Sequence, residues 1–283
     1  MKRLLFWAAI LGISSILLVF FLGPLQRPHT VQLPILMYHH ISEDGAGGSA
    51  IAKAEFEDHL QMLTQNGYTA VLPADLLDFA NKGRPLPDKP ILLTFDDGYA
   101  SVFTEALPLL KEYGLRAASF VIGVSVGKST YKDTGMTMTP HFSFDQARQM
   151  EASGIFDVQS HTHDLHQVPA YDGENCRVGM VRLPSDTEDS FAKHVLEDLK
   201  LSREALEANL PSPVFALAYP YGRYDEVTES LCRQSGFCMT LTTEPGLNCL
   251  TAGDPNCLYG LRRFPADDLT AAELLALLEN SAS

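Results

Sequence analysis

One pattern of hydrophobic and polar positions recurs along the chain: an amphipathic stretch of helical period, a glycine, and a short apolar stretch typical of a β-strand. It is found in four segments, 54–72, 101–123, 142–161 and 225–243. Glycine follows each helical stretch because it readily adopts the left-handed conformation found at helix C-termini. The glycines in question are Gly67, Gly114, Gly154 and Gly236.

Individual residues refine where these helices begin. Ser143 is expected to cap the N-terminus of the third helix, since a serine side chain accepts a hydrogen bond from the first turn. Thr270 and Glu273 have capping-box spacing and predict one more helix near the C-terminus. Pro108 lies inside the second helical stretch and is expected either to start or to kink that helix, because proline has no backbone N–H.

Apolar stretches predict strands at 31–38, 69–72, 91–95, 117–122, 155–159, 214–219 and 237–242. Strands that alternate with helices indicate an α/β fold with a mostly parallel sheet covered by helices. The size of this part of the chain suits one large domain, a closed or nearly closed barrel of about seven strands. A doubly wound sheet fits the same alternation. In both folds the active site forms at the carboxyl ends of the strands.

The N-terminal segment follows a different pattern. The residues from Leu4 to Leu22 carry no charge, and Lys2 and Arg3 precede them. This length of apolar sequence predicts a transmembrane helix within residues 1–25, which acts as a signal anchor. Positive charge before the helix predicts that residues 26–283 lie outside the cell, as one catalytic domain held at the cell membrane. The alternative is a cleaved signal peptide and a secreted domain.

Composition narrows the choice of partners and of covalent links. The net charge of −14 and the pI near 5.0 argue against nucleic acid or anionic lipid as a partner. Cysteines in an exported chain suggest one or two disulfides. The close pairs are Cys232 with Cys238 and Cys249 with Cys257, which would leave Cys176 free. No Cys-x-x-Cys motif supports a thiolate zinc site.

Two adjacent aspartates, Asp96 and Asp97, end the apolar stretch 91–95. Asp97 followed by Gly98 fits a simple turn, but a turn does not explain Asp96. Like charges held close together repel and raise one pKa, whereas a bound cation accounts for both carboxylates. Chemistry-bearing residues follow other predicted strands as well: His39, His40, His161 and Tyr221.

The segment "SHTHDLH" brings His161, His163 and His166 close together in sequence, and such a group favours a metal site. One interpretation is the H-x-H-x-D-H motif of metallo-β-lactamase-like hydrolases, which hold two ions. In this chain, however, the aspartate is Asp164, one position early, and Leu165 occupies the required position.

A second interpretation joins the segments. "TFDDG" (94–98), the histidines and "YPYG" (219–222), in this order, resemble the polysaccharide deacetylase family, also called carbohydrate esterase family 4 or the NodB homology fold. The resemblance covers about residues 33 to 265 and implies a distorted (β/α) barrel. It implies that Asp96 is the catalytic base and that Asp97, His161 and His166 hold a divalent metal. The metal implied is Zn²⁺, with Co²⁺ or Ni²⁺ as alternatives.

The spacing of the histidines departs from the general family. The usual His-(Ser/Thr)-x-x-His would place Leu165 as a ligand, so the second ligand here is His166, one residue later. This longer spacing resembles the subgroup that deacetylates poly-β-1,6-N-acetylglucosamine in biofilms. That subgroup supplies its acid histidine from the first strand, which implies His39 in "ILMYHHIS" and a structural role for His40. The usual arginine before the tyrosine-proline motif and the usual C-terminal Leu-x-His are both absent.

The resemblance completes the expected site and the expected reaction. The backbone N–H of Tyr221 is the expected donor to an oxyanion, and Arg263, or less so Arg262, is expected to pair with Asp96. The expected enzyme removes N-acetyl groups from N-acetylglucosamine residues of an extracellular polysaccharide. Alternatives are a peptidoglycan or chitooligosaccharide N-deacetylase, an O-acetyl esterase, and an inactive carbohydrate-binding module. The insertion 171–189 is either a lid or a plain surface excursion.

Overall fold

The computed structural model describes residues 29–46, 49–132 and 134–281. The predicted signal anchor and the boundary at residue 25 lie outside these residues. Of the helices in the described ranges, none combines the length and the apolar character needed to cross a membrane.

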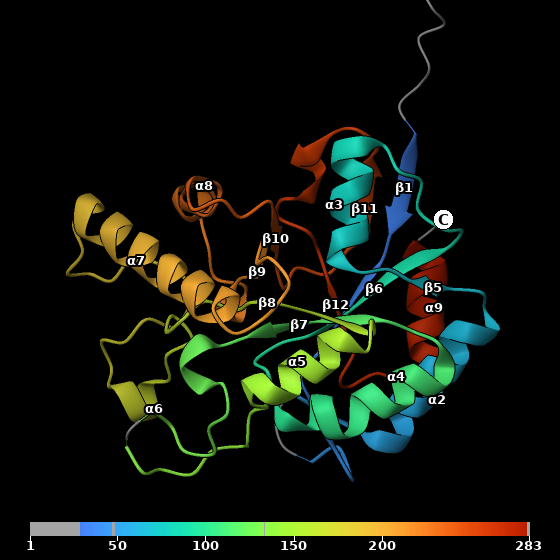
Figure 1. The fold of residues 1–283 in the computed structure, drawn as a ribbon, viewed down its shortest axis with the longest axis horizontal. Coiled ribbons are helices and arrows are strands. Elements are labelled where there is room, and N and C mark those ends of the chain that lie inside the picture. The colour runs from blue at the N-terminus through green and yellow to red at the C-terminus, as the bar shows by residue number, and fades with distance from the viewer. Residues whose placement is uncertain (1–28, 47–48, 133, 282–283) are drawn as a thin grey trace, which may run out of the picture.

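A parallel sheet forms the centre of the molecule (Figure 1). Its strands follow one another in the order β10-β9-β8-β7-β6-β2-β12, and β5 pairs with β6 beside this path. Their bounds are β2 (Ile35–Tyr38), β5 (Thr69–Ala70), β6 (Pro90–Phe95), β7 (Ala117–Val121), β8 (Phe156–Ser160), β9 (Ala216–Ala218), β10 (Met239–Leu241) and β12 (Phe264–Pro265). Each expected strand contributes to this sheet, although only the second half of the expected strand 31–38 does so, as β2. The α/β prediction is confirmed.

The segment 261–266, which we name the closing segment, connects the two ends of the strand order. Leu261 forms a parallel bridge with Leu241 of β10, and β12 within the same segment pairs with β2. The Ala266 N–H also donates to the Met37 carbonyl at 3.0 Å. The sheet is therefore a distorted, incomplete β/α barrel. The closing segment lies in the gap between β10 and β2 and contacts both strands.

Helices surround this sheet, and α2 packs against both α4 and α9 while α7 packs against α8 (Figure 1). Their bounds are α2 (Lys53–Gln65), α3 (Pro73–Lys82), α4 (Leu107–Tyr113), α5 (Phe144–Ala152), α6 (Pro169–Asp172), α7 (Glu188–Glu207), α8 (Glu226–Gln234) and α9 (Ala271–Ser281). Two small strand pairs lie outside the main sheet: β1 (Thr30–Leu33) with β11 (Asn248–Thr251), and β3 (His40–Ser42) with β4 (Ala50–Ala52).

The expected helix signals act as predicted. The Ser143 hydroxyl accepts a hydrogen bond from the Gln146 N–H at the start of α5. Gly114 ends α4 in the left-handed conformation, with φ at 66°. Pro108 lies in the first turn of α4, directly after the π-helical turn η1 (Val102–Ala106), so it starts that helix. The pattern had not indicated α3 or α7.

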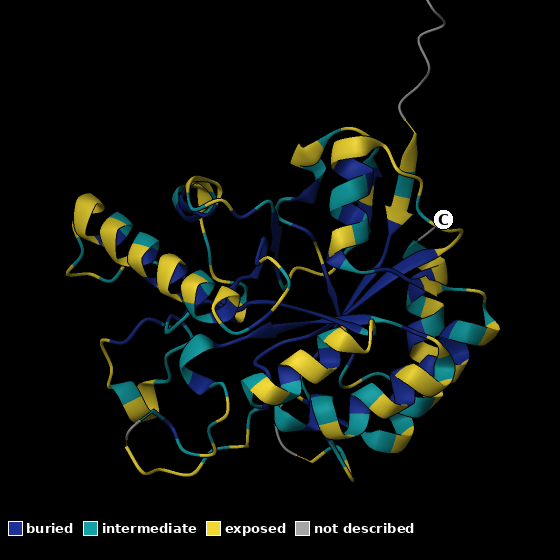
Figure 2. Ribbon diagram, viewed as in Figure 1, coloured by how far each residue is buried: buried dark blue, intermediate teal, exposed yellow. Residues whose placement is uncertain are grey.

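Both faces of the sheet are buried, which explains why its strands are continuous apolar runs. Every residue of β6 is buried, and its side chains alternate between two hydrophobic clusters. Leu93 and Phe95 belong to the larger cluster, and Leu92 belongs to the smaller one. Figure 2 shows the sheet as a buried layer within helices whose outer faces are exposed.

The two expected disulfides are wrong. The structure holds all five cysteines as free thiols: Cys176, Cys232, Cys238, Cys249 and Cys257. Cys232 lies on the buried face of α8, whereas the half-buried Cys238 lies beyond the end of that helix, with its Sγ 3.7 Å from the Gly236 carbonyl oxygen. Short sequence spacing therefore did not bring these thiols together, because the turn after α8 separates them. The expectation that Cys176 is free is confirmed.

Candidate active site

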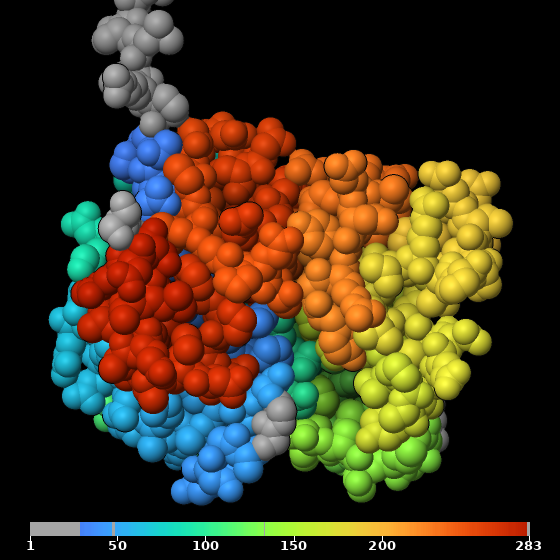
Figure 3. Space-filling view, turned by 180° about the vertical axis from the view of Figure 1, so that it is seen from behind, coloured from blue at the N-terminus to red at the C-terminus, as the bar shows by residue number. Residues whose placement is uncertain are grey.

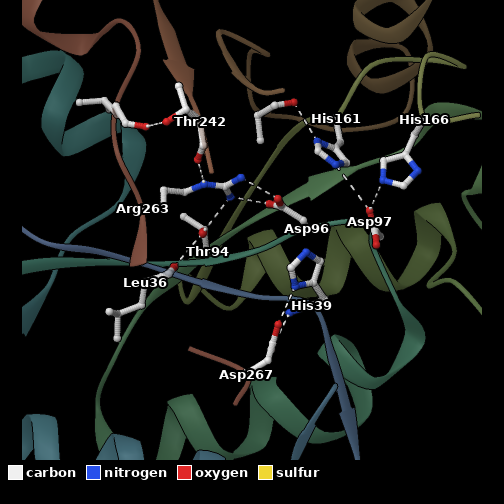
Figure 4. A network of polar contacts seen from close by, with 12 residues as sticks. Leu36, His39, Thr94, Asp96, Asp97, His161, His166, Thr242, Arg263 and Asp267 are labelled. Carbon is white, nitrogen blue, oxygen red and sulfur yellow. Dashed lines mark hydrogen bonds and ion pairs between the residues drawn. The ribbon is translucent and has the colours of Figure 1, made fainter. Parts of the chain in front are cut away.

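The polar residues found at strand ends in the sequence gather at one rim of the barrel (Figure 4). Because the strands are parallel, their carboxyl ends meet at the same edge of the sheet. His39 follows β2, Asp96 and Asp97 follow β6, and His161 follows β8. The rim therefore combines residues that are far apart in the chain.

Asp97, His161 and His166 form a group that fits a metal ion. The Asp97 Oδ1 lies 3.5 Å from the His161 Nε2 and 3.4 Å from the His166 Nε2. One donor atom from each of the three side chains lies within 4.8 Å of the other two. The Asp97 Oδ1 is buried and accepts no hydrogen bond from any described residue. A buried oxygen without a partner is costly, so this donor set fits a divalent cation well.

A hydrogen bond to the backbone orients the ring of His161 so that its Nε2 faces Asp97. Its Nδ1 donates a hydrogen bond to the Ala218 carbonyl oxygen at 2.8 Å, which leaves the Nε2 unprotonated. Burial lowers the pKa of His161 to about 4, more than the neighbouring aspartates raise it. The imidazole is therefore neutral at physiological pH, as a metal ligand must be.

Backbone strain concentrates around this group. Asp97, Thr162 and Tyr221 adopt left-handed conformations with φ of 69°, 68° and 56°, which are uncommon for residues other than glycine. Gly98 adopts φ of 90°, and a Cβ there would lie 2.9 Å from the Val121 Cγ1. Strained residues persist where the surrounding structure fixes them, and they cluster at functional sites.

Helix α7 supports the loop that carries the metal histidines. The Asp198 carboxylate accepts hydrogen bonds from the backbone N–H groups of His163 (2.8 Å) and Asp164 (2.7 Å). The Ser202 hydroxyl lies 2.7 Å from the hydroxyl of Ser160, which precedes the loop. Asp198 and Ser202 were missed in the sequence. The available signal was their position as polar residues on the apolar face of the helical period 188–207.

Asp96 and Arg263 form a buried, bidentate ion pair. The Nη1 and Nη2 of Arg263 each donate to one carboxylate oxygen at 2.7 Å, and its Nε donates to the Thr242 carbonyl at 2.7 Å. Burial by itself would raise the pKa of Asp96, but the Arg263 guanidinium holds it well below its usual range. The closing segment thus supplies Arg263 as the partner. Arg262 instead lies 3.9 Å from Glu244 in an exposed pair.

His39 is held by a second residue near the closing segment, Asp267. The His39 Nδ1 lies 2.7 Å from the Asp267 Oδ2, and the His39 backbone N–H donates to the other oxygen at 3.2 Å. Burial by itself would lower the pKa of His39. The hydrogen bond to Asp267 and the charges of Asp96 and Asp97 outweigh that effect and raise the pKa to about 9. His39 is therefore protonated at neutral pH, between Asp267 and the two aspartates (Figure 4).

The remaining predicted residues have distinct surroundings. The His40 Nδ1 lies 2.8 Å from the Ser101 hydroxyl, and the His40 ring lies 5.3 Å from the ring of Tyr99. Tyr221 lies beside His166, with ring centroids 4.0 Å apart, and its hydroxyl donates to the Gln167 carbonyl at 3.3 Å. Tyr221 is 41% exposed, so it presents part of its surface to solvent beside the metal ligand His166.

A cavity of 470 Å³ opens beside the metal group, and Asp97 and His166 form part of its wall. Tyr99 and His141 also line it, with ring centroids 5.0 Å apart, and neither was identified from the sequence. Burial and the neighbouring Asp97 carboxylate raise the pKa of Tyr99, which keeps its hydroxyl protonated. Figure 3 shows a hollow where the blue, green and orange parts of the surface meet.

Comparison with known proteins identifies relatives over most of the chain. The family model described as "Polysaccharide deacetylase" matches residues 83–240. The chain is 30% identical over 233 residues to the putative polysaccharide deacetylase YxkH of Bacillus subtilis, covering 82% of this chain and 70% of that protein. It is 26% identical over 187 residues to the poly-β-1,6-N-acetyl-D-glucosamine N-deacetylase of Staphylococcus epidermidis, covering 66% of this chain and 59% of that enzyme.

Solved structures give the same result for the fold. A de-N-acetylase from Aggregatibacter actinomycetemcomitans superposes with a TM-score of 0.75 at 22% identity, covering 87% of this chain and all of that one. IcaB from Ammonifex degensii superposes with a TM-score of 0.69 at 27% identity, covering 87% of this chain and 96% of that one.

Proposed function

The chain belongs to the polysaccharide deacetylase family and is a hydrolase of that kind, and from this premise we propose that it removes N-acetyl groups from N-acetylglucosamine residues of an extracellular poly-β-1,6-linked polysaccharide. A lactamase-like hydrolase is excluded by the family. The observation that carries the proposal is the position of His39, whose Nδ1 lies 2.7 Å from the Asp267 Oδ2, at the rim that also carries Asp96 and the metal group. An amide needs an acid to protonate its leaving amine, and this arrangement supplies one.

The choice of glycan is supported by two further observations. The histidine spacing from His161 to His166 resembles that of the poly-β-1,6-N-acetylglucosamine subgroup, and relatives of 26% and 23% identity carry that activity in their names. The chain spans 59% of the length of those staphylococcal enzymes. Their substrate is therefore only proposed for this chain.

We propose Zn²⁺ as the ion held by Asp97, His161 and His166, since two imidazoles and one carboxylate suit it. When bound, such an ion supplies Lewis-acid activation of the acetyl carbonyl and makes water a better nucleophile at neutral pH. Measurement of metal content in the purified full-length chain tests this. One ion per chain is expected, and two would contradict the single group described above.

The residues of the chain have distinct roles in the proposed reaction. Asp96, kept ionised by Arg263, accepts a proton from the attacking water. The backbone N–H of Tyr221 is proposed to stabilise the oxyanion that forms on the acetyl carbonyl. His39 then donates its proton to the amine nitrogen as the carbon–nitrogen bond breaks. Acetate leaves, and the sugar keeps a free amine.

Acetate release from a panel of defined glycans tests the proposed substrate. We expect the full-length, metal-loaded chain to release acetate from β-1,6-linked N-acetylglucosamine oligomers faster than from chitooligosaccharides, peptidoglycan fragments or O-acetylated sugars. Faster release from one of the other substrates would assign the chain to that activity instead. Release from none of them, by protein that binds the metal, would favour the inactive binding module.

We also propose that residues 1–25 anchor the catalytic domain at the outer face of the cell membrane. The support is the apolar run from Leu4 to Leu22 after two basic residues. Fractionation of expressing cells is expected to place the full-length chain in the membrane, with the catalytic domain accessible to protease added outside. Recovery of a shortened chain in the medium would indicate a cleaved signal instead.

A further inference from the structure

The insertion 171–189 takes no part in the reaction steps described above, yet it contacts two parts of the site. Its segment 177–180, which we name the linking segment, is hydrogen-bonded both to the loop that carries His166 and to the turn that carries Tyr221. Within it, Val178 forms an antiparallel bridge with His166 itself. The linking segment is therefore in a position to connect the two parts.

The first contact is a short antiparallel ladder with the metal-binding loop. The Gln167 N–H donates to the Arg177 carbonyl at 3.1 Å, and the Gly179 N–H donates to the Leu165 carbonyl at 3.0 Å. The Arg177 N–H also donates to the Gln167 side-chain oxygen at 2.7 Å. Hydrogen bonds to the insertion thus hold the backbone on both sides of His166.

The second contact joins the linking segment to the turn before α8. The Met180 N–H donates to the Arg223 carbonyl at 2.9 Å. Gly179, with φ of 96°, lies against the same turn: a Cβ at this position would lie 2.6 Å from the Arg223 Cβ and 3.0 Å from the Pro220 carbonyl oxygen. Carbon atoms in contact are normally about 3.5–4.0 Å apart, so only glycine fits here without displacing the turn.

A buried ion pair anchors the linking segment. The Nη1 and Nη2 of the buried Arg177 each donate to one carboxylate oxygen of Asp186 at 2.8 Å, and its Nη1 also donates to the Val181 carbonyl at 3.1 Å. The same guanidinium lies 5.6 Å from the centre of the Phe191 ring in α7. A bidentate pair fixes orientation as well as distance, so the linking segment has a defined place beside the site.

We infer that the insertion 171–189 is a clamp that sets the distance between the metal-binding loop at His166 and the turn at Tyr221, with Gly179 as its positioning residue. The inference rests on the proposed function, because it assigns the insertion a role in that site. The proposed oxyanion forms beside the metal ligands and is stabilised by the Tyr221 N–H. A change in the distance between loop and turn therefore misplaces the donor.

Gly179→Ala in the full-length protein, purified in detergent, tests this inference. The added methyl group has to move the turn away from the metal-binding loop by about 1 Å. At saturating zinc, kcat on β-1,6-linked N-acetylglucosamine oligomers is expected to fall about 10- to 100-fold. The Kd for zinc, measured by titration calorimetry without substrate, is expected to rise about tenfold.

Gly173→Ala is the matched control. Gly173 lies in the same insertion with φ of 86°, and a Cβ there would meet no atom within 4 Å. The control therefore introduces a similar backbone strain without the close approach. Its kcat and its Kd for zinc are expected to equal those of wild type. Equal losses in Gly173→Ala and Gly179→Ala would overturn the inference, because strain within the insertion would then account for both.

Arg223→Gly provides a rescue that a general loss of structure would not show. It removes the Cβ that lies nearest to the methyl group added at position 179. Measured against Arg223→Gly alone, the double variant Gly179→Ala/Arg223→Gly is expected to lose less kcat and less zinc affinity than Gly179→Ala loses against wild type. Equal losses in the two backgrounds would overturn the inference.

Asp186→Asn keeps the inference testable if Gly179→Ala does not fold. The substitution weakens the pair that anchors the linking segment, so the Kd for zinc is expected to rise about tenfold. Arg182→Ala is its control, because it breaks only the more exposed pair with Glu188 at 3.6 Å and should keep the wild-type Kd. A wild-type Kd in Asp186→Asn would overturn the inference.

Failure of the clamp and failure of the proposed function are distinguishable, because the Kd for zinc is measured without substrate. If the wild-type chain deacetylates oligomers and Gly179→Ala equals it in kcat and Kd, the clamp is wrong and the proposed function stands. If the wild-type chain releases no acetate, but the Kd for zinc rises in Gly179→Ala and not in Gly173→Ala, the proposed function is wrong and the clamp stands.

Discussion

Asp96 and Asp97 are adjacent in sequence but have different surroundings. Both oxygens of Asp96 accept hydrogen bonds from Arg263, whereas the Asp97 Oδ1 faces the two imidazoles. The left-handed backbone at Asp97 turns its side chain away from that of its neighbour. One carboxylate is thereby kept as a base, and the other is available to a cation.

Replacement of Asp96 by Asn is expected to reduce acetate release by about 100- to 10,000-fold, because the base is removed. Metal content, measured on the same sample, should remain that of wild type. The variant also leaves the buried Arg263 without an anionic partner, so its free energy of unfolding should fall by about 3–5 kcal/mol. Loss of the metal in a folded Asp96→Asn protein would reverse the roles of the two aspartates.

The pH dependence of the reaction is expected to depend on His39. The imidazole acts as an acid only in its protonated form, and its pKa is raised to about 9. Activity should therefore fall as the pH rises through the pKa of His39. In the metal-loaded enzyme this alkaline limb lies at or below pH 9, because a bound cation offsets the raising effect of Asp96 and Asp97.

The variant Asp267→Asn tests directly whether His39 determines the alkaline limb of the pH dependence. The substitution removes the charge that helps to keep His39 protonated, so the alkaline limb of kcat is expected to move to lower pH. Activity at pH 6 should be affected less than activity at pH 8. A limb that keeps its position in Asp267→Asn would mean that a group other than His39 donates the proton.

Helix α7 acts on the metal group through the loop that it supports. Asp198→Asn leaves an amide in place of a carboxylate that accepts from two backbone N–H groups, and the amide cannot accept through both of its ends. Metal affinity, measured by titration calorimetry, is expected to fall about 10- to 100-fold.

Glu197→Gln is the matched control for this prediction, because Glu197 is the exposed neighbour of Asp198 on the same helix. Its affinity for the metal should equal that of wild type. A similar affinity in Asp198→Asn would show that the loop keeps its strained conformation without help from α7.

Sequence reasoning predicted most strands of the sheet, but it missed the helix α7 despite the helical period of residues 188–207. The strands of the sheet are apolar on both faces, and their polar ends align by parallel packing, so the shared rim of Asp97 and His161 followed from the pattern, whereas His166 followed from the family resemblance. The strand β12 has two residues, which is too short for any period, and its pairing depends on contacts distant in sequence. Asp267, which lies just after it, could therefore not be identified as the partner of His39.

The whole molecule should gain stability from the metal. Ligands from β6 and from the loop after β8 are brought together only in the folded state, so binding favours that state. At metal concentrations 1,000-fold above Kd the gain is about 4 kcal/mol, and Tm should rise by roughly 10 °C for a domain of this size. Scanning calorimetry with zinc and with chelator measures the difference. Asp97→Ala should show no such rise.

The closing segment also determines the order in which the site can assemble. Arg263 and Asp267, the partners of Asp96 and His39, both follow residue 260, later in the chain than Asp97, His161 and His166. A nascent chain that has not yet emerged beyond residue 260 therefore lacks both partners, even when every metal ligand is present.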